Sequence, residues 1–61
     1  TARELDVLEA SANGLSNARI AESLVISQAT VKTHLSHIYT KLGVTSRSAA
    51  VARARENGLI R

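Results

Sequence analysis

Serines and glycines divide this chain into four short segments, each with room for only a few helical turns. The serines that precede an apolar stretch of helical spacing, and can cap its first turn, are Ser16, Ser27 and Ser46. The glycines that follow such stretches, where helices often end in a left-handed residue, are Gly14, Gly43 and Gly58. Proline is absent and alanine, the strongest helix former, is abundant. We therefore predict an all-α fold of four helices.

Aliphatic residues recur at helical spacing within each segment and predict the core. Thr1 and Glu4 fit a capping box for the first helix, whose inward stripe is expected to be Leu5, Leu8, Ala12 and then Leu15. Leu5 and Val7 cannot both face the centre of the core, so one of them should be partly exposed. The longest segment repeats Val31, Leu35, Ile38 and Leu42. The remaining core candidates are Ile20, Ala21, Leu24, Ala50, Val51 and Ala54, with Leu59 and Ile60 folding back.

The composition allows little beyond one small domain. The chain has 61 residues, which we assign to a single domain over 1–61, and Tyr39 is its one aromatic residue, so the core must be aliphatic. There is no cysteine, no apolar run near the ~20 residues of a membrane span, and no sequence resembling a signal peptide. We expect a cytoplasmic fragment of a longer protein, without disulfides or thiolate metal sites.

Charge is distributed unevenly along the chain. The net charge is +3, and residues 1–22 hold four of the five acids. Residues 23–55 hold no acid but five of the cations: Lys32, Lys41, Arg47, Arg53 and Arg55. Such a stretch presents a positive face, as binding to phosphates requires, although a merely solvated cationic surface has the same composition.

Residues 16–43 have the pattern of a helix-turn-helix. Ala21 is small, as required where two helices cross closely, and Val31 follows ten positions later on the expected core side. The turn has Val25 where such turns often have glycine. Opposite the apolar stripe of the longest segment lie Ala29, Thr33, Ser36 and Thr40, flanked by Lys32 and His37. A face of small hydrogen-bonding residues beside a cation, without the Glu–Lys pairs of a solvated helix, can approach base edges in a major groove.

A series of motifs runs through the chain in a fixed order. They are Thr1-Ala2-Arg3-Glu4, Val7-Leu8, Gly14-Leu15-Ser16-Asn17, Ile20-Ala21, Ile26-Ser27, Thr30-Val31-Lys32-Thr33-His34 and Lys41-Leu42-Gly43-Val44, then Arg47, Ala50, Val51 and Ala54. In order and spacing they resemble the C-terminal DNA-binding domain of the LuxR/FixJ/NarL family of bacterial transcription regulators. The resemblance covers essentially all 61 residues.

This resemblance implies that the third helix, residues 28–42, lies in the major groove of double-stranded DNA. The residues expected to meet base edges are Ala29, Lys32, Thr33 and Ser36. Those expected to meet phosphates are Asn17, Ser27, Gln28, Thr30, His34 and Lys41. A weak homodimer is expected through a stripe on the fourth helix, formed by Ser48, Ala52 and Arg55. The resemblance also implies RNA polymerase as a partner, and neither a cofactor nor a small-molecule ligand in this fragment.

Five positions depart from the family pattern, in three respects. Arg19 stands where the family usually has glutamate, which adds a cation near the DNA side. Ala29 and Ser36 are smaller than the basic residues often found at their positions, which leaves fewer direct base contacts. Ala52 and Arg55 make the dimer stripe small and charged. Sequence preference and dimer strength therefore stay open.

Other functions compete with DNA binding by a response regulator. Within the family, the domain could serve a quorum-type regulator that senses a small ligand. Related alternatives are a promoter-recognition domain resembling region 4 of sigma factors, and a helix-turn-helix that binds an acidic protein. His34 and His37 lie one turn apart, but no third metal ligand has a suitable spacing. Since no nucleophile, base and orienting carboxylate come together, we expect no enzyme.

Overall fold

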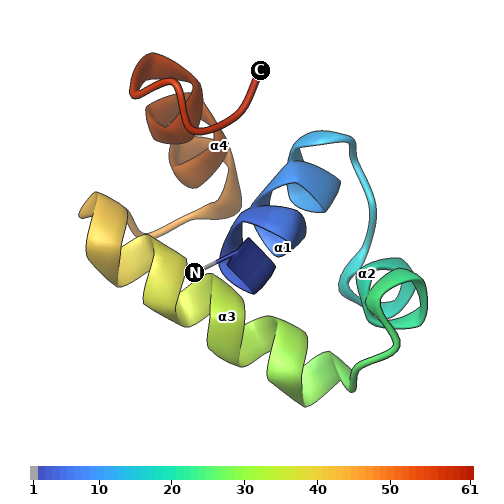
Figure 1. Cartoon of the computed structure of the whole chain (residues 1–61). Coiled ribbons are helices and arrows are strands. Elements are labelled where there is room, and N and C mark those ends of the chain that lie inside the picture. Colours follow the sequence, from blue (N-terminus) through green and yellow to red (C-terminus); the bar gives the residue numbers. More distant parts are fainter. Residues whose placement is uncertain (1) are drawn as a thin grey trace.

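The computed structural model describes residues 2–61 and contains four helices in this range. They are α1 (Ala2–Ala12), α2 (Asn17–Leu24), α3 (Gln28–Leu42) and α4 (Arg47–Glu56). In Figure 1 the long α3 crosses the molecule, α1 packs over its middle, and α2 and α4 flank α1 on either side. The predicted all-α, four-helix fold is confirmed. Thr1, the expected cap of the first helix, lies outside the described residues.

Serine side chains begin three of the helices, as predicted. Each Oγ accepts a hydrogen bond from the backbone N–H three residues later, and each serine has an extended backbone at the helix entry. The pairs are Ser16 with Arg19 at 3.3 Å, Ser27 with Thr30 at 3.1 Å, and Ser46 with Ala49 at 3.2 Å. These bonds satisfy backbone donors that have no partner inside the helix, so the starts of the helices are specified locally.

The core is aliphatic and lies where α1, α2, α3 and α4 converge. Its buried apolar residues are Val7, Leu8, Ile20, Ala21, Val31, Leu35, Ile38, Ala50, Ala54 and Ile60. Leu42, predicted for the core, is only partly buried and packs against it, as do Leu15, Leu24 and Val51.

Two sequence-based core assignments were wrong. On α1 the buried face is Glu4, Val7, Leu8 and Ser11, so Leu5 lies at its edge with 38% of its surface exposed. At the chain end only one of two adjacent residues can face inward, and this is Ile60, while Leu59 is 44% exposed.

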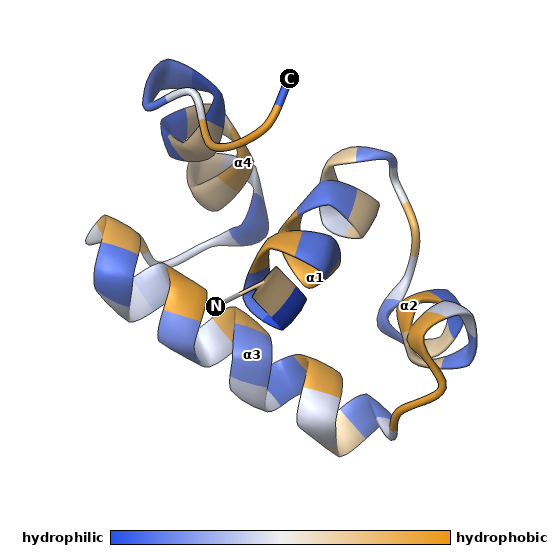
Figure 2. Cartoon of the chain, in the orientation of Figure 1, coloured by the Kyte–Doolittle hydropathy of each residue, from blue (hydrophilic) through white to orange (hydrophobic). Residues whose placement is uncertain are grey.

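The connection between α2 and α3 closes the helix-turn-helix with an unusual residue. Val25 adopts the left-handed conformation, with φ of 58°, and is 89% exposed. Its N–H bonds to Glu22 O at 3.3 Å and the following N–H, of Ile26, bonds to Ala21 O at 3.0 Å. In Figure 2 this connection is a continuous hydrophobic stretch. Because a branched Cβ clashes with the backbone in this region, Val25 costs the fold about 1–2 kcal/mol without packing in return.

We expect Val25→Gly to stabilise the domain by about 0.5–1.5 kcal/mol. Relief of the left-handed conformation outweighs the extra chain entropy of glycine, and hardly any buried surface is lost. Urea unfolding followed by circular dichroism measures the change. The matched control is Ala52→Gly at an exposed position inside α4, which should lose about 0.5–1 kcal/mol. Equal losses in both variants would contradict the strain assigned to Val25.

Candidate nucleic-acid interface

The outward face of α3 brings together the four residues predicted to meet base edges. Ala29, Lys32, Thr33 and Ser36 are all exposed, while Val31, Leu35 and Ile38 on the opposite side are buried in the core. The core thus holds the helix by one face and leaves the other free over most of its length. This arrangement suits insertion of a helix into a groove, and the contacts with bases stay a prediction.

Threonine hydroxyls on this face already donate their hydrogens to the helix backbone. Thr33 Oγ1 donates to Ala29 O at 3.1 Å, and Thr40 Oγ1 donates to Ser36 O at 3.1 Å. A hydroxyl bound in this way presents its lone pairs outward together with the threonine methyl group. Thr33 can therefore accept a hydrogen bond from an exocyclic amine of adenine or cytosine, or contact a thymine methyl.

The start of α3 has the properties of a phosphate site. Ser27 Oγ accepts from Thr30 N at 3.1 Å, and the two side-chain oxygens are 2.9 Å apart. Ser27, Gln28 and Thr30 are exposed. They are therefore accessible to phosphate, and their contacts with it stay a prediction. Backbone N–H groups of a first helical turn have no carbonyl partner within the helix and carry the positive end of its dipole. Together these donors favour an anion at this end of the helix.

His34 lies next to this region and is half-buried. Its Nδ1 is buried and has no hydrogen-bond partner among the described residues, so the alternative of a hydrogen-bonded core histidine is not seen at this nitrogen. The other ring nitrogen, Nε2, is the one available to donate to a phosphate oxygen.

Asn17, at the start of α2, is bound by Arg47, which the sequence analysis counted among the cations and the family motifs without assigning it a contact. Arg47 Nη2 donates to Asn17 Oδ1, and Nη1 donates to Leu15 O at 2.9 Å. The partners are 30 and 32 positions apart in the sequence. No local sequence spacing predicts such a contact, because it depends on how α4 packs beside the segment that joins α1 to α2.

Lys41, a predicted phosphate contact, is paired with a carboxylate of the same chain. Its Nζ donates to Glu4 Oε1 at 2.7 Å, and His37 Nδ1 lies 3.5 Å from Glu4 Oε2. The Glu4 side chain is 9% exposed and that of Lys41 is 61% exposed. Glu4, which the sequence indicated mainly as a helix cap, therefore also ties α1 to the C-terminal half of α3. The pKa of Glu4 is lowered from its usual 4.5 to about 2, and the hydrogen bond from Lys41 is the largest of the causes.

The predicted dimer stripe on α4 is solvent-exposed. Ser48, Ala52 and Arg55 are all exposed, whereas Ala50 and Ala54 are buried. Arg55 Nε donates to Arg61 O at 3.0 Å, which ties one end of the stripe to the chain end. The surface is available to a partner, and pairing through it stays a prediction.

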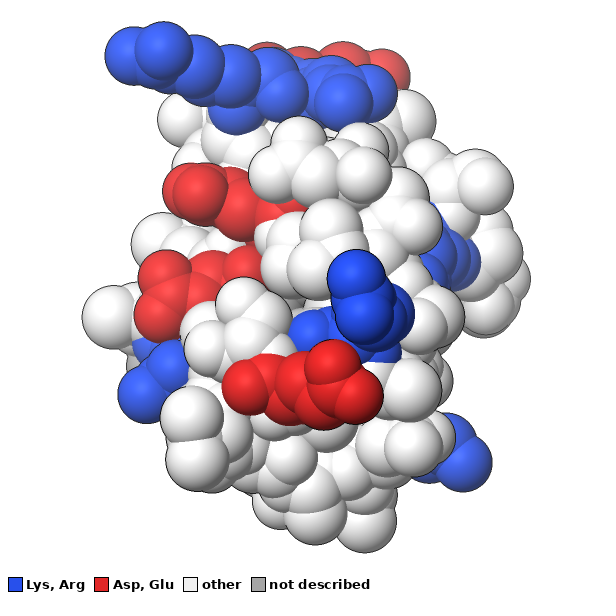
Figure 3. Space-filling model, turned by 90° about the vertical axis from the view of Figure 1, so that its right-hand side faces the viewer, with Lys and Arg blue, Asp and Glu red and all other residues white. Residues whose placement is uncertain are grey.

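Acidic side chains are distributed unevenly among the helices. Three of the five acids lie on α1, and α3 has none. Viewed from the side in Figure 3, a band of basic side chains lies at the top, at the level of α4 and the chain end, and acidic and basic groups are mixed below it. The helix predicted to enter DNA is thus the one without carboxylates to repel phosphates.

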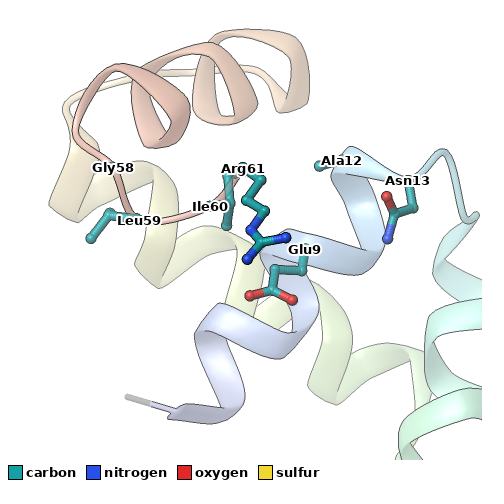
Figure 4. Close-up of a pocket in the computed structure, with 7 residues that line it drawn as sticks. All are labelled: Glu9, Ala12, Asn13, Gly58, Leu59, Ile60 and Arg61. Atoms are coloured by element: carbon teal, nitrogen blue, oxygen red, sulfur yellow. The ribbon is translucent and has the colours of Figure 1, made fainter.

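An open hollow of about 540 Å³ lies between the end of α1 and the chain end. Its lining is Glu9, Ala12, Asn13, Gly58, Leu59, Ile60 and Arg61, and Figure 4 shows the side chains of Glu9 and Arg61 facing each other across it. The ionisable side chains of this lining are those of Glu9 and Arg61. Among residues 2–61 no group of three or more histidine, cysteine and acidic residues is placed to hold a metal ion.

Comparison with known proteins agrees with this architecture. Residues 1–54 match the description "Bacterial regulatory proteins, luxR family". The chain belongs to the luxR family. It is 47% identical over 60 residues to the uncharacterized transcriptional regulatory protein YxjL of Bacillus subtilis (strain 168), covering 98% of this chain and 28% of that protein. It is 43% identical over 61 residues to the transcriptional regulatory protein DegU of Brevibacillus brevis, covering 100% of this chain and 26% of DegU.

A solved structure shows the same fold. The crystal structure of the response regulator ChrA in a heme-sensing two-component system superposes with a TM-score of 0.96 and 55% identity. The match covers 98% of this chain and 30% of ChrA. The luxR-type regulatory domain predicted from the motifs is confirmed, and the chain spans less than a third of these relatives. None of the described helices is long and apolar enough to cross a membrane.

We expect acid to destabilise the wild-type domain more than Glu4→Gln. Because the pKa of Glu4 is lowered from 4.5 to about 2 in the folded state, its stabilising effect is present above pH 4.5 and is lost as the pH falls towards 2. Glutamine does not titrate, so the stability of the variant does not contain this pH-dependent contribution. Thermal midpoints between about pH 6 and about pH 2 measure it, with exposed Glu9→Gln as the control on the same helix. Parallel acid profiles for wild type and Glu4→Gln would contradict the assigned ion pair.

Proposed function

We propose that this domain binds double-stranded DNA in a sequence-specific manner, as the effector unit of a bacterial transcription regulator in the cytoplasm. The observation that carries the proposal is the outward face of α3, which is exposed, free of acids, and built from small hydrogen-bonding side chains beside Lys32. An α-helix of this kind fits the width of a major groove. Membership of the luxR family supports the same function.

Two sets of residues divide the work of recognition in this proposal. Base edges are read by Ala29, Lys32, Thr33 and Ser36. Phosphates are bound by Asn17, Ser27, Gln28, Thr30, His34 and Lys41. Lys41 keeps further N–H donors beyond the one directed at Glu4, but the carboxylate offsets part of its charge. Most of these phosphate ligands are neutral, so they position the domain without releasing counterions.

The regulator that contains this domain is proposed to be a two-component response regulator. The 55% identity with the response regulator ChrA supports this over a quorum-type regulator. We further propose that RNA polymerase is a partner of the DNA-bound domain. A helix-turn-helix that binds an acidic protein remains the competing class, and it predicts no preference among duplex sequences.

Binding to duplex DNA should depend on salt and on sequence. Lys32 should account for much of the sequence dependence. The test compares the duplex preferred in a selection from random sequences with its scrambled version, at several salt concentrations. We expect a logarithmic salt slope of roughly −2 to −4, from about two to four effective charges. Lys32→Ala should lose about 1–3 kcal/mol on the preferred duplex and much less on the scrambled one, because guanine O6 and N7 accept from its ammonium.

Lys41→Ala is the matched control, since a phosphate contact carries no sequence information. It should weaken both duplexes about equally. If Lys32→Ala and Lys41→Ala lose the same affinity on both duplexes, Lys32 contacts phosphate and not a base. Binding that ignores salt, or no binding to any duplex, would refute the proposed function.

We propose that two domains pair on DNA through the stripe formed by Ser48, Ala52 and Arg55. The stripe is small and carries a cation, so the area it buries falls far below the ~800 Å² per partner of a standard stable interface. DNA must therefore contribute most of the pairing free energy, by holding two domains on adjacent half-sites. In such an isologous contact each Ala52 meets the partner's copy of the stripe.

Ala52→Glu should abolish cooperative binding to a duplex with two half-sites. It should leave the fold and binding to one half-site nearly intact, because Ala52 is exposed on the side of α4 away from its buried alanines. Binding isotherms with one and two half-sites measure the effect. Asn13→Glu places the same charge at another exposed position and should keep cooperativity. A tight dimer without DNA, or undiminished cooperativity in Ala52→Glu, would show that another surface pairs.

A further inference from the structure

We infer that Arg47 is a positioning residue for DNA binding, which orients the side-chain amide of Asn17 towards phosphate. The inference rests on the proposed function, since it assumes that the domain binds DNA and that Asn17 lies at the phosphate backbone. It adds a residue of α4 to the recognition of DNA, although α4 lies outside the helix-turn-helix. Arg47 acts through Asn17 and does not itself touch DNA.

The guanidinium of Arg47 is held at two points. Nη1 donates to Leu15 O at 2.9 Å, and Nη2 donates to Asn17 Oδ1. Both Arg47 and Asn17 are half-buried, which limits the movement of their side chains. A planar guanidinium with two of its nitrogens bound has little rotational freedom left. Arg47 therefore fixes the connection before α2 and the first side chain of α2 in one arrangement.

The bond to Asn17 decides which way the amide faces. An asparagine side chain has one acceptor oxygen and one NH₂ donor, which exchange places when the amide rotates by half a turn. With Oδ1 engaged by Arg47, the remaining polar atom is the donor Nδ2, which suits a phosphate oxygen. The bond is also charge-assisted, and it polarises the amide so that Nδ2 becomes a stronger donor. Without Arg47 the amide can turn its oxygen to the phosphate, which repels it.

The location of Arg47 in its own helix supports a role elsewhere. Arg47 is the first residue of α4, directly after the cap Ser46. A cation is unfavourable at a helix N-terminus, so stabilisation of α4 does not explain an arginine there. Asn17, by contrast, is the first residue of α2 after the cap Ser16. Arg47 therefore donates to the first residue of α2 and does not serve its own helix.

A double-mutant cycle tests the inference, using Asn17→Ala, Arg47→Met, Arg47→Lys and the double variant Asn17→Ala/Arg47→Met. Binding to the preferred duplex is measured by fluorescence anisotropy at several salt concentrations, well below each variant's unfolding midpoint. Each single variant should weaken binding about two- to tenfold, the usual effect of losing one hydrogen bond. The double variant should bind no more weakly than Asn17→Ala alone, because Arg47 acts through Asn17. Arg47→Met should keep the wild-type salt slope.

Other outcomes would overturn the inference. Independent, additive losses from Asn17→Ala and Arg47→Met would mean that Arg47 does not act through the amide. A salt slope weaker by about 0.9 in Arg47→Met, with full affinity in Arg47→Lys, would make Arg47 a direct phosphate contact. If Arg47→Met does not fold, Arg47→Lys replaces it in the cycle, since it keeps the charge but loses the planar fork. If the wild-type domain binds no duplex, the proposed function itself fails, whereas additive losses in a domain that binds leave it standing.

Discussion

The packing of α3 against the aliphatic core by one face is the constraint on which the rest of the structure depends. Val31, Leu35 and Ile38 are buried, and the positions between them are exposed except for the half-buried His34. None of the other three described helices covers those positions. The core that stabilises the domain therefore also determines which side chains can reach another molecule, so stability and recognition come from opposite sides of one helix.

Glu4, Arg53 and the turn at Val25 secure this helix at its ends. Glu4 holds Lys41 near the C-terminal end, and Arg53 Nη1 donates to Leu42 O at 3.2 Å in the last turn. The turn at Val25 sets the angle at which α2 meets the start of α3. None of these contacts lies among the residues proposed to read bases. They keep the orientation of α3 constant while its outward residues remain free to differ in chemistry.

Local chemistry explains why much of the fold could be predicted from the sequence. The capping serines bond to N–H groups three residues away, so Ser27 specifies the start of α3 within a single turn. The exposed face of α3 followed from the same periodicity. The expectation that one of Leu5 and Val7 is partly exposed is confirmed. The error was to place Leu5 in the inward stripe, because stripes through either residue fit one helix and only the positions of the other helices distinguish them. The pairs Glu4–Lys41 and Asn17–Arg47 join residues 37 and 30 positions apart, and no local pattern encodes them.

The pairing of Glu4 with Lys41 makes one ammonium group serve two purposes. The same cation that fastens α1 to α3 is among those proposed to meet the phosphate backbone. Loss of the carboxylate at position 4 leaves the whole charge of Lys41 to attract any duplex, while the packing of α1 loses an anchor. With Lys41 in its proposed role, non-specific attraction to DNA is coupled to resistance to unfolding. A substitution at Glu4, which is not among the residues proposed to contact DNA, can thus change the time that such a domain spends on DNA.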